Sequence, residues 1–148
     1  MKLEQQVCSL EPAKKLKELG VKQESLFYWY QEKGDYEPKI KQPNSVYDWG
    51  HQLDYADATL DKEVSELCSA FTVAELGEML PASITIGGEV MMLCVYSIKT
   101  ESFPNNWLVV YETDYPYRDE NKHSKAFMNT EADARAKMLI WLIENKYL

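Results

Sequence analysis

The last twenty residues of the chain constrain its fold more than any other stretch. Six apolar residues recur there at helical spacing and define one face of a helix: Ala132, Ala136, Leu139, Ile140, Ile143 and Tyr147. Three further residues widen this face until only a narrow polar strip remains: Met138, Trp141 and Leu142. Thr130 and Asp133 are placed to cap the first turn. A helix this apolar must be covered by other parts of the chain.

Three segments that precede this helix are predicted to be strands. Ser83–Ile86 and Glu89–Ile98 are separated by a glycine pair typical of a tight hairpin turn, and Trp107–Thr113 follows as the next strand. Apolar residues alternate onto both faces of Glu89–Ile98, so this strand is expected in the interior of a sheet. We predict that the segments around Val95 and Val109 form a curved layer covered by the C-terminal helix.

The first third of the chain contains one predicted helix and one predicted hairpin. Leu10–Leu19 has an apolar face and is followed by Gly20, a residue common just after a helix. Leu26–Tyr30 is rich in aromatic residues, which favours a strand. Glu37–Gln42 is expected to return beside it as an edge strand with Pro38 near its start.

The middle of the chain is predicted to contain a loop and two short helices. Residues 43–58 have no clear periodicity, and four of them are expected to attach this loop to the body: Tyr47, Trp49, Leu53 and Tyr55. From Thr59 the spacing becomes helical, with four residues on one face: Leu60, Val64, Leu67 and Phe71. Thr72 and Glu75 form the pattern of a capping box that opens the second helix, which ends at Pro81.

Length and composition fit one folded domain over residues 1–148. A chain of 148 residues with 45% hydrophobic residues can bury a core without metals or disulfides. The predicted fold is α+β, with an antiparallel β-meander packed against the C-terminal helix and shorter accessory helices. Cys8, Cys68 and Cys94 are odd in number and widely spaced, so we expect them to be reduced and mostly buried.

The location of the protein is predicted from two features that the sequence lacks, a membrane-spanning segment and the apolar core of a signal peptide. No run approaches the roughly 20 residues that span a bilayer. The segment MKLEQQVCSL lacks the apolar core of a signal peptide. We therefore expect a cytoplasmic protein that does not enter a membrane.

The net charge of −8 is concentrated in the middle of the chain. Residues 1–34 carry a net +1, residues 35–80 carry −7, and the remainder carries −2. Nucleic-acid binders normally present a basic stripe, so this balance argues against nucleic acid as a partner. It favours solubility and a basic partner.

Four residues in the acidic middle are of metal-ligating types: His51, Asp54, Asp57 and Asp61. On a helix their spacing would bring them near one face, and a metal-dependent enzyme centred on residues 51–61 is one alternative. The interpretation we prefer is a solvated acidic segment that favours the N-terminal end of the helix predicted from Thr59.

No other pattern indicates catalysis. The chain has only two histidines, His51 and His123, and neither has a sequence context that pairs it with a cysteine or a strained serine. Common phosphate-loop, dinucleotide and zinc motifs are missing from the sequence. We therefore predict no catalytic residue, no bound metal and no cofactor.

Residues 10–31 offer a helix-turn-helix as a second alternative. In that arrangement Gly20 and Val21 would form the turn, and four lysines would meet phosphates: Lys14, Lys15, Lys17 and Lys22. Its second segment, LFYWYQEK, prefers a strand, and it would bring Glu24 and Glu32 toward DNA. A strand over Ser25–Tyr30 would exclude this alternative.

Aromatic residues are more numerous than one small core needs. Seven of them are predicted as partner-binding residues: Tyr28, Tyr30, Tyr36, Tyr47, Trp49, Tyr115 and Tyr117. Tyrosine and tryptophan are common anchors of protein interfaces, which supports this prediction. The alternative is that these side chains simply fill a two-sided sheet.

Three stretches resemble a known group of proteins: VCSLEPAKKLKELGVKQESLFYW, SAFTVAELGEMLP and NTEADARAKMLIWLIEN. They are similar to segments of small, uncharacterised proteins encoded by phages and prophages, many from gut-associated bacteria. The resemblance covers about a third of the chain and leaves residues 30–68 and 82–128 as the variable part. It implies a phage or prophage origin and a compact fold, and it implies no activity or catalytic residue.

These observations predict a non-enzymatic accessory protein that binds another protein through an acidic, aromatic surface. The partner would be a host or phage protein, and self-association of the chain is left open. A nucleic-acid-associated regulator using residues 10–31 and a metal-dependent enzyme centred on residues 51–61 are the alternatives.

Overall fold

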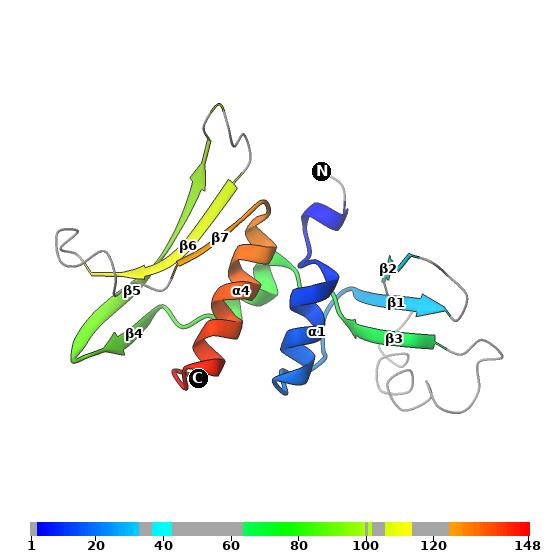
Figure 1. Cartoon of the computed structure of the whole chain (residues 1–148), viewed down its shortest axis with the longest axis horizontal. Coiled ribbons are helices and arrows are strands. Elements are labelled where there is room, and N and C mark those ends of the chain that lie inside the picture. The colour runs from blue at the N-terminus through cyan, green and yellow to red at the C-terminus, as the bar shows by residue number, and fades with distance from the viewer. Residues whose placement is uncertain (1–2, 33–36, 43–63, 100, 102–105, 114–124) are drawn as a thin grey trace.

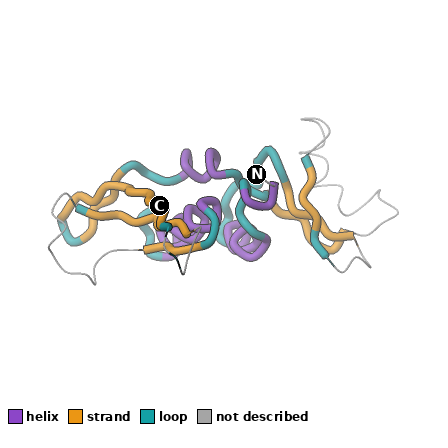
Figure 2. The backbone as a smooth tube through the Cα atoms, turned by 90° about the horizontal axis from the view of Figure 1, so that it is seen from above, coloured by secondary structure: helices purple, strands orange, loops and turns teal. Residues whose placement is uncertain are grey.

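The computed structural model describes residues 3–32, 37–42, 64–99, 101, 106–113 and 125–148. Its elements follow one another in this order: η1 (Leu3–Gln5), α1 (Leu10–Glu18), β1 (Tyr28–Glu32), β2 (Lys39–Lys41), β3 (Val64–Ser69), α3 (Val73–Met79), β4 (Ser83–Ile86), β5 (Glu89–Ile98), β6 (Asn106–Glu112), β7 (Lys125–Met128) and α4 (Glu131–Glu144). The helices lie between two antiparallel sheets, as Figures 1 and 2 show. The predicted α+β class is confirmed.

The larger sheet has four strands in the order β4-β5-β6-β7. Gly87 and Gly88, with φ of 60° and 86°, form the tight turn between β4 and β5. Val95 of β5 lies opposite Val109 of β6, as the predicted meander requires. Strand β7 was not predicted, because the sequence before it reads as a polar connection and the strand itself has only four residues. The smaller sheet has the order β2-β1-β3.

Helix α4 is contacted on several sides, which explains why so few of its residues are polar. It packs against β6 and β7 of the larger sheet and also against α1 and α3. Six of its residues are buried: Ala132, Ala134, Ala136, Met138, Leu139 and Leu142. These side chains join one continuous core that reaches from Leu16 of α1 to Val109 and Tyr111 of β6.

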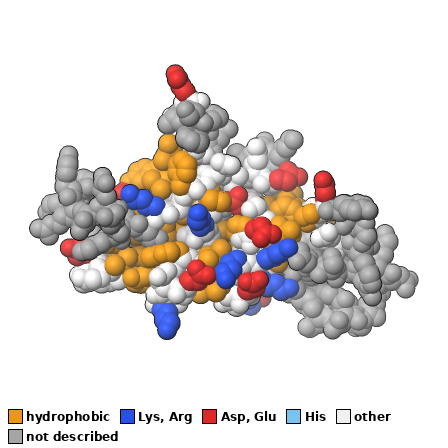
Figure 3. All heavy atoms as spheres, viewed as in Figure 1, with side chains coloured by type: hydrophobic (Ala, Val, Ile, Leu, Met, Phe, Trp, Pro, Cys, Tyr) orange, Lys and Arg blue, Asp and Glu red, His pale blue; other side chains and the backbone are white. Residues whose placement is uncertain are grey.

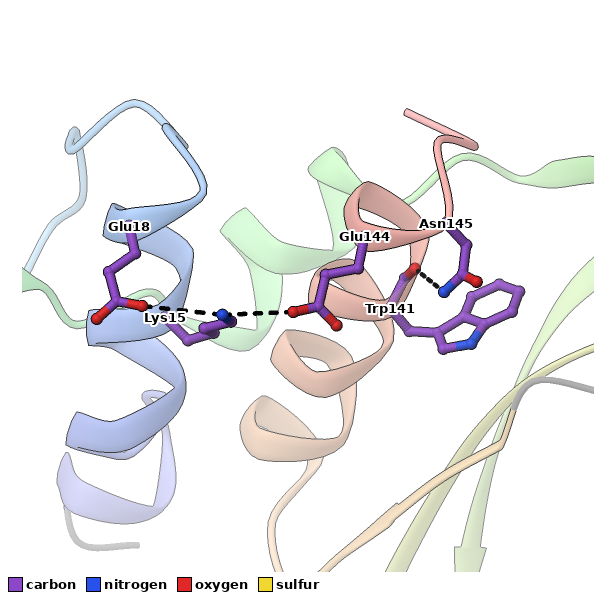
Figure 4. A network of polar contacts seen from close by, with 5 residues as sticks. All are labelled: Lys15, Glu18, Trp141, Glu144 and Asn145. Carbon is purple, nitrogen blue, oxygen red and sulfur yellow. Dashed lines mark hydrogen bonds and ion pairs between the residues drawn. The ribbon is translucent and has the colours of Figure 1, made fainter.

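Helices α1 and α4 run side by side in the same direction. At their N-terminal ends the Ser9 N–H donates to Asp133 Oδ1 at 2.7 Å. Near their C-terminal ends Lys15 Nζ lies 3.4 Å from Glu144 Oε1 and 3.8 Å from Glu18 Oε2 (Figure 4). Parallel helices place like dipole ends together, so an acid at the N-terminal ends and a lysine near the C-terminal ends both reduce the repulsion.

The predicted capping box at the start of α3 is present. The Thr72 hydroxyl accepts the Glu75 N–H at 3.2 Å, and the Glu75 carboxylate accepts the Thr72 N–H at 2.7 Å. The same carboxylate accepts the Ser25 hydroxyl at 2.9 Å and the Leu26 N–H at 2.8 Å. Glu75 therefore ties the start of α3 to the chain segment that leads into β1.

The helix predicted after Thr59 is wrong for its described part, because Val64–Ser69 forms strand β3. The helical spacing is overridden by pairing with β1, which brings Cys68 opposite Trp29 and gives the β1 backbone a second neighbour. Strand β1 also begins two residues later than predicted, at Tyr28. The predicted loop over residues 43–58 lies outside the described residues.

Candidate functional site

The candidate functional site is the side of the larger sheet that faces away from α4, which we call the outer face. Side chains alternate along a strand, and the inner-face residues Met91, Val109 and Ala126 belong to the core. The register between the strands then places eight apolar residues on the outer face: Val90, Met92, Cys94, Tyr96, Ile98, Leu108, Val110 and Phe127.

Four of these side chains are strongly exposed to solvent. Val90 is 61% exposed, Met92 45%, Tyr96 44% and Phe127 44%. In the part of the chain that the structure describes, only Leu26 and Leu148 are also large, apolar and exposed. Figure 3 shows hydrophobic side chains at the surface over this sheet. Exposed apolar residues thus concentrate on one face rather than being scattered singly.

Tyr96 is held in place at the centre of the outer face. Its hydroxyl donates a hydrogen bond to Glu112 Oε1 on the neighbouring strand. Tyr96 lies opposite Leu108, and Glu112 lies opposite Met92. The pair Cys94 and Val110 lies between these two pairs, so the phenol ring extends across it to reach Glu112. The hydrogen bond to Glu112 raises the pKa of Tyr96 above its usual range, and Cys94 contributes in the same direction. The phenol therefore remains a neutral donor.

The chemistry of the outer face suits contact with another protein. The Tyr96 ring is already ordered, so a partner that covers it loses little side-chain entropy. Lys125 is exposed on the outer face, in register with Val110, and Glu112 supplies the opposite charge. An apolar centre with a few polar groups at its margin is the usual anatomy of a protein interface.

The predicted tyrosine surface is not exposed where the structure describes it. Tyr28 and Tyr30 are each 8% exposed, and their rings pack edge to face with centroids 6.4 Å apart. Lys41 Nζ lies 3.9 Å from the centroid of the Tyr30 ring. Both rings are therefore structural here rather than available to a partner. The remaining predicted anchors lie outside the described residues: Tyr36, Tyr47, Trp49, Tyr115 and Tyr117.

The helix-turn-helix alternative is wrong, because its second segment forms strand β1 instead of a recognition helix. Three of its four lysines lie next to acids rather than forming a separate basic surface. Lys14 is 3.9 Å from Glu11, Lys15 is 3.4 Å from Glu144, and Lys22 is 2.7 Å from Glu24. Lys17 lies on the same helix α1. Acidic and basic side chains are interspersed over the helices in Figure 3.

The candidate metal ligands His51, Asp54, Asp57 and Asp61 lie outside the described residues, as does His123. Among the residues that are described, no group of three or more histidine, cysteine, aspartate or glutamate side chains could hold a metal ion. Cys8 and Cys68 are buried, Cys94 is half-buried, and none of the three is in a disulfide. Burial raises the pKa of the Cys8 thiol to about 12, which makes it a poor nucleophile.

A cleft of about 760 Å³ lies on the opposite side of the sheet from the outer face. Its walls include the starts of α3 and α4 together with Ser97, Lys99 and Trp107. Hydroxyls of Thr72 and Thr130 already accept N–H groups from the first turns of these helices. The described lining contains no histidine or cysteine, so it offers no thiol or imidazole for nucleophilic catalysis.

Sequence reasoning overlooked the outer face although the signal was present. Alternation on both sides of β5 correctly predicts an interior strand, and β5 indeed has neighbours on both sides. The alternation does not indicate which face of β5 is covered by a helix. Only the inner face meets α4.

No protein-family model matches the chain, and neither a curated protein nor a solved structure matches it. No helix in the described ranges is long and apolar enough to cross a membrane. Because no known protein matches the chain, its function is inferred from the residues of the outer face.

Proposed function

We propose that this chain is a non-enzymatic phage or prophage accessory protein that binds a host or phage protein through the outer face of its larger sheet. The observation that supports this proposal is the concentration of exposed apolar side chains on one face: Val90, Met92, Tyr96 and Phe127. Covering apolar surface stabilises a complex by about 25 cal/mol per Å² before the costs of association. The resemblance of three segments to phage proteins supports the proposed origin.

The proposed surface differs in place from the tyrosine set that the sequence favoured. Its anchors come from β5 and β7 of the larger sheet, whereas Tyr28 and Tyr30 come from β1 of the smaller one. None of the three cysteines is in a disulfide, which supports placing the protein in the cytoplasm, where thiols are kept reduced. The net charge of −8 favours a partner that is basic outside the apolar contact.

The experiment compares two double variants that each remove two exposed apolar side chains. Val90→Ser with Met92→Ser alters the outer face, and Leu26→Ser with Leu148→Ser is the matched control elsewhere on the surface. Proteins and nucleic acids captured from a host lysate by the unaltered protein are identified at low and moderate salt. A captured protein is then purified, and its dissociation constant is measured with each variant.

We expect the outer-face variant to bind the purified partner at least about tenfold more weakly, a loss of about 1.4 kcal/mol. The control variant should bind as the unaltered protein does. Equal binding by both variants would contradict the proposal. Capture of DNA or RNA alone, lost when Lys14, Lys15 and Lys22 are changed to Glu, would contradict it as well.

A further inference from the structure

Strand β4 covers only part of the β5 edge. Its four residues pair with Glu89–Met92, and one further bond joins the Leu93 N–H to the Ala82 carbonyl oxygen at 2.9 Å. Strand β5 continues from there to Ile98 (Figure 1). On this edge, no described residue pairs with the backbone beyond Leu93.

The register determines which backbone groups point to the open edge. Leu93 bonds toward Ala82, so odd-numbered residues of β5 direct both N–H and C=O toward β4, and even-numbered residues bond to β6. Val95 and Ser97 therefore direct two donors and two acceptors away from β6, and Ser97 is exposed. A row of backbone groups with no partner among the described residues is a template for another strand.

We infer that a second copy of this chain pairs with the open edge, β5 against β5. The two copies are related by a two-fold axis that passes between their two Ser97 residues. The two strands then run antiparallel, as an isologous contact between identical edges requires. Ser97 lies opposite Ser97 of the second copy, and Val95 lies opposite its Lys99. The donors and acceptors of Val95 and Ser97 all find partners in this arrangement.

Two features favour a second copy in this register. Tyr96 would lie opposite Ile98 of the second copy on the outer face, so two apolar residues are opposed there. Lys99 would face Val95, so no like charges are opposed. A register centred on Val95 is blocked, because it would place Ser97 of the second copy opposite Leu93, whose N–H already donates to Ala82.

The pairing would extend the sheet across both copies without covering the outer face. Because the two-fold axis is perpendicular to the sheet, the helices of both copies lie on one side and both outer faces lie on the other. The inference therefore goes beyond the proposed function and is tested separately. The contact is short, so a weak and concentration-dependent dimer is expected.

The first experiment measures molar mass by analytical ultracentrifugation over a range of protein concentrations. Ser97→Pro removes the N–H that points to the open edge, where proline is tolerated because β6 does not use this group. Ser97→Ala keeps the N–H and is the matched control. We expect mass to rise toward twice the monomer value for the unaltered protein and for Ser97→Ala, and to stay monomeric for Ser97→Pro.

The second experiment uses cysteine cross-linking and does not depend on the proline variant folding. Residues opposite each other in a hydrogen-bonded antiparallel pair have Cα atoms about 5.5 Å apart, within the range that a disulfide spans. In a Cys94→Ser background, Ser97→Cys should form a covalent dimer on mild oxidation. Thr85→Cys, exposed on the neighbouring strand β4, should not.

Three results would overturn the inference. The first is a monomer at every concentration up to about 1 mM. The second is a dimer that Ser97→Pro does not disrupt, although circular dichroism shows that this variant is folded. The third is equal cross-linking at positions 85 and 97. Loss of dimer with unchanged partner binding would leave the proposed function intact, so the two proposals can fail independently.

Discussion

At the scale of single residues, Glu75 joins more parts of the chain than its place in a short helix indicates. Its carboxylate accepts four hydrogen bonds, from Thr72 N–H, Thr72 hydroxyl, Ser25 hydroxyl and Leu26 N–H, at distances of 2.7–2.9 Å. The capping box could be predicted from local spacing. The bonds to residues 25 and 26 could not, because they join segments about 50 residues apart.

We predict that Glu75→Gln lowers the free energy of unfolding by about 1–3 kcal/mol, because either orientation of the amide turns its NH2 group toward a backbone N–H, that of Thr72 or that of Leu26. The measurement is urea unfolding at neutral pH. Glu78→Gln, an exposed acid on the same helix, is the control and should change stability by less than about 0.5 kcal/mol. Equal losses for the two variants would contradict the role given to Glu75.

The buried Cys8 thiol makes stability depend on alkaline pH. Desolvation raises its pKa from 9.0 to about 12, and burial raises the pKa of Tyr111 from 10.0 to about 12. A raised pKa in the folded state means that stability is full below the unfolded pKa and is lost as pH rises toward the folded one. We predict a fall in the urea midpoint as the pH rises from about 9 toward about 12. Cys8→Ala should reduce this fall, and an undiminished fall would contradict the assignment.

At the scale of elements, Asp133 contributes differently from what its position indicates. The sequence places it as a cap for α4, and its N–H does donate to the Thr130 hydroxyl at 3.1 Å. Its carboxylate, however, accepts the Ser9 N–H of the neighbouring helix, 124 residues away in sequence. No local pattern encodes a bond between segments so distant, so this part of the α1–α4 contact could not be predicted.

We predict that Asp133→Ala lowers the free energy of unfolding by about 1–2 kcal/mol, because it removes an acceptor from one helix start and an acid from the other. Asp133→Asn keeps an acceptor and should retain part of that stability. Lys15→Ala should cost less than about 0.5 kcal/mol, since the Lys15 and Glu144 side chains are 43% and 46% exposed. The reverse order in thermal unfolding would contradict this account of the helix pair.

The elements that could be predicted are those with long, regular periodicity. Strands β5 and β6 and helix α4 show strand or helix spacing over 10, 7 and 14 residues. Strand β3 could not be predicted, because its apolar residues fit a helix and only its pairing with β1 decides otherwise. Within the site, the apolar alternation of β5 was visible, but which face α4 covers is decided by packing.

At the scale of the whole molecule, one hydrophobic core joins the smaller sheet, the helices and the larger sheet. Leu16 of α1 and Cys68 of β3 belong to the same buried cluster as Met91 and Val109 of the larger sheet. We predict that the chain unfolds in one cooperative transition. The measurement compares tryptophan fluorescence with far-ultraviolet circular dichroism during urea unfolding. Two separate midpoints would contradict a single core.

The central claim is that α4 covers the inner face of the larger sheet and leaves the outer face free to bind. Adjacent methionines on β5 test it most directly, since Met91 is 1% exposed and Met92 is 45% exposed. Each is changed to Ala, and the free energy of unfolding is measured in urea. We predict a loss of about 2–5 kcal/mol for Met91→Ala and less than about 0.5 kcal/mol for Met92→Ala. Comparable losses at both positions would show that the outer face is covered and would contradict the account.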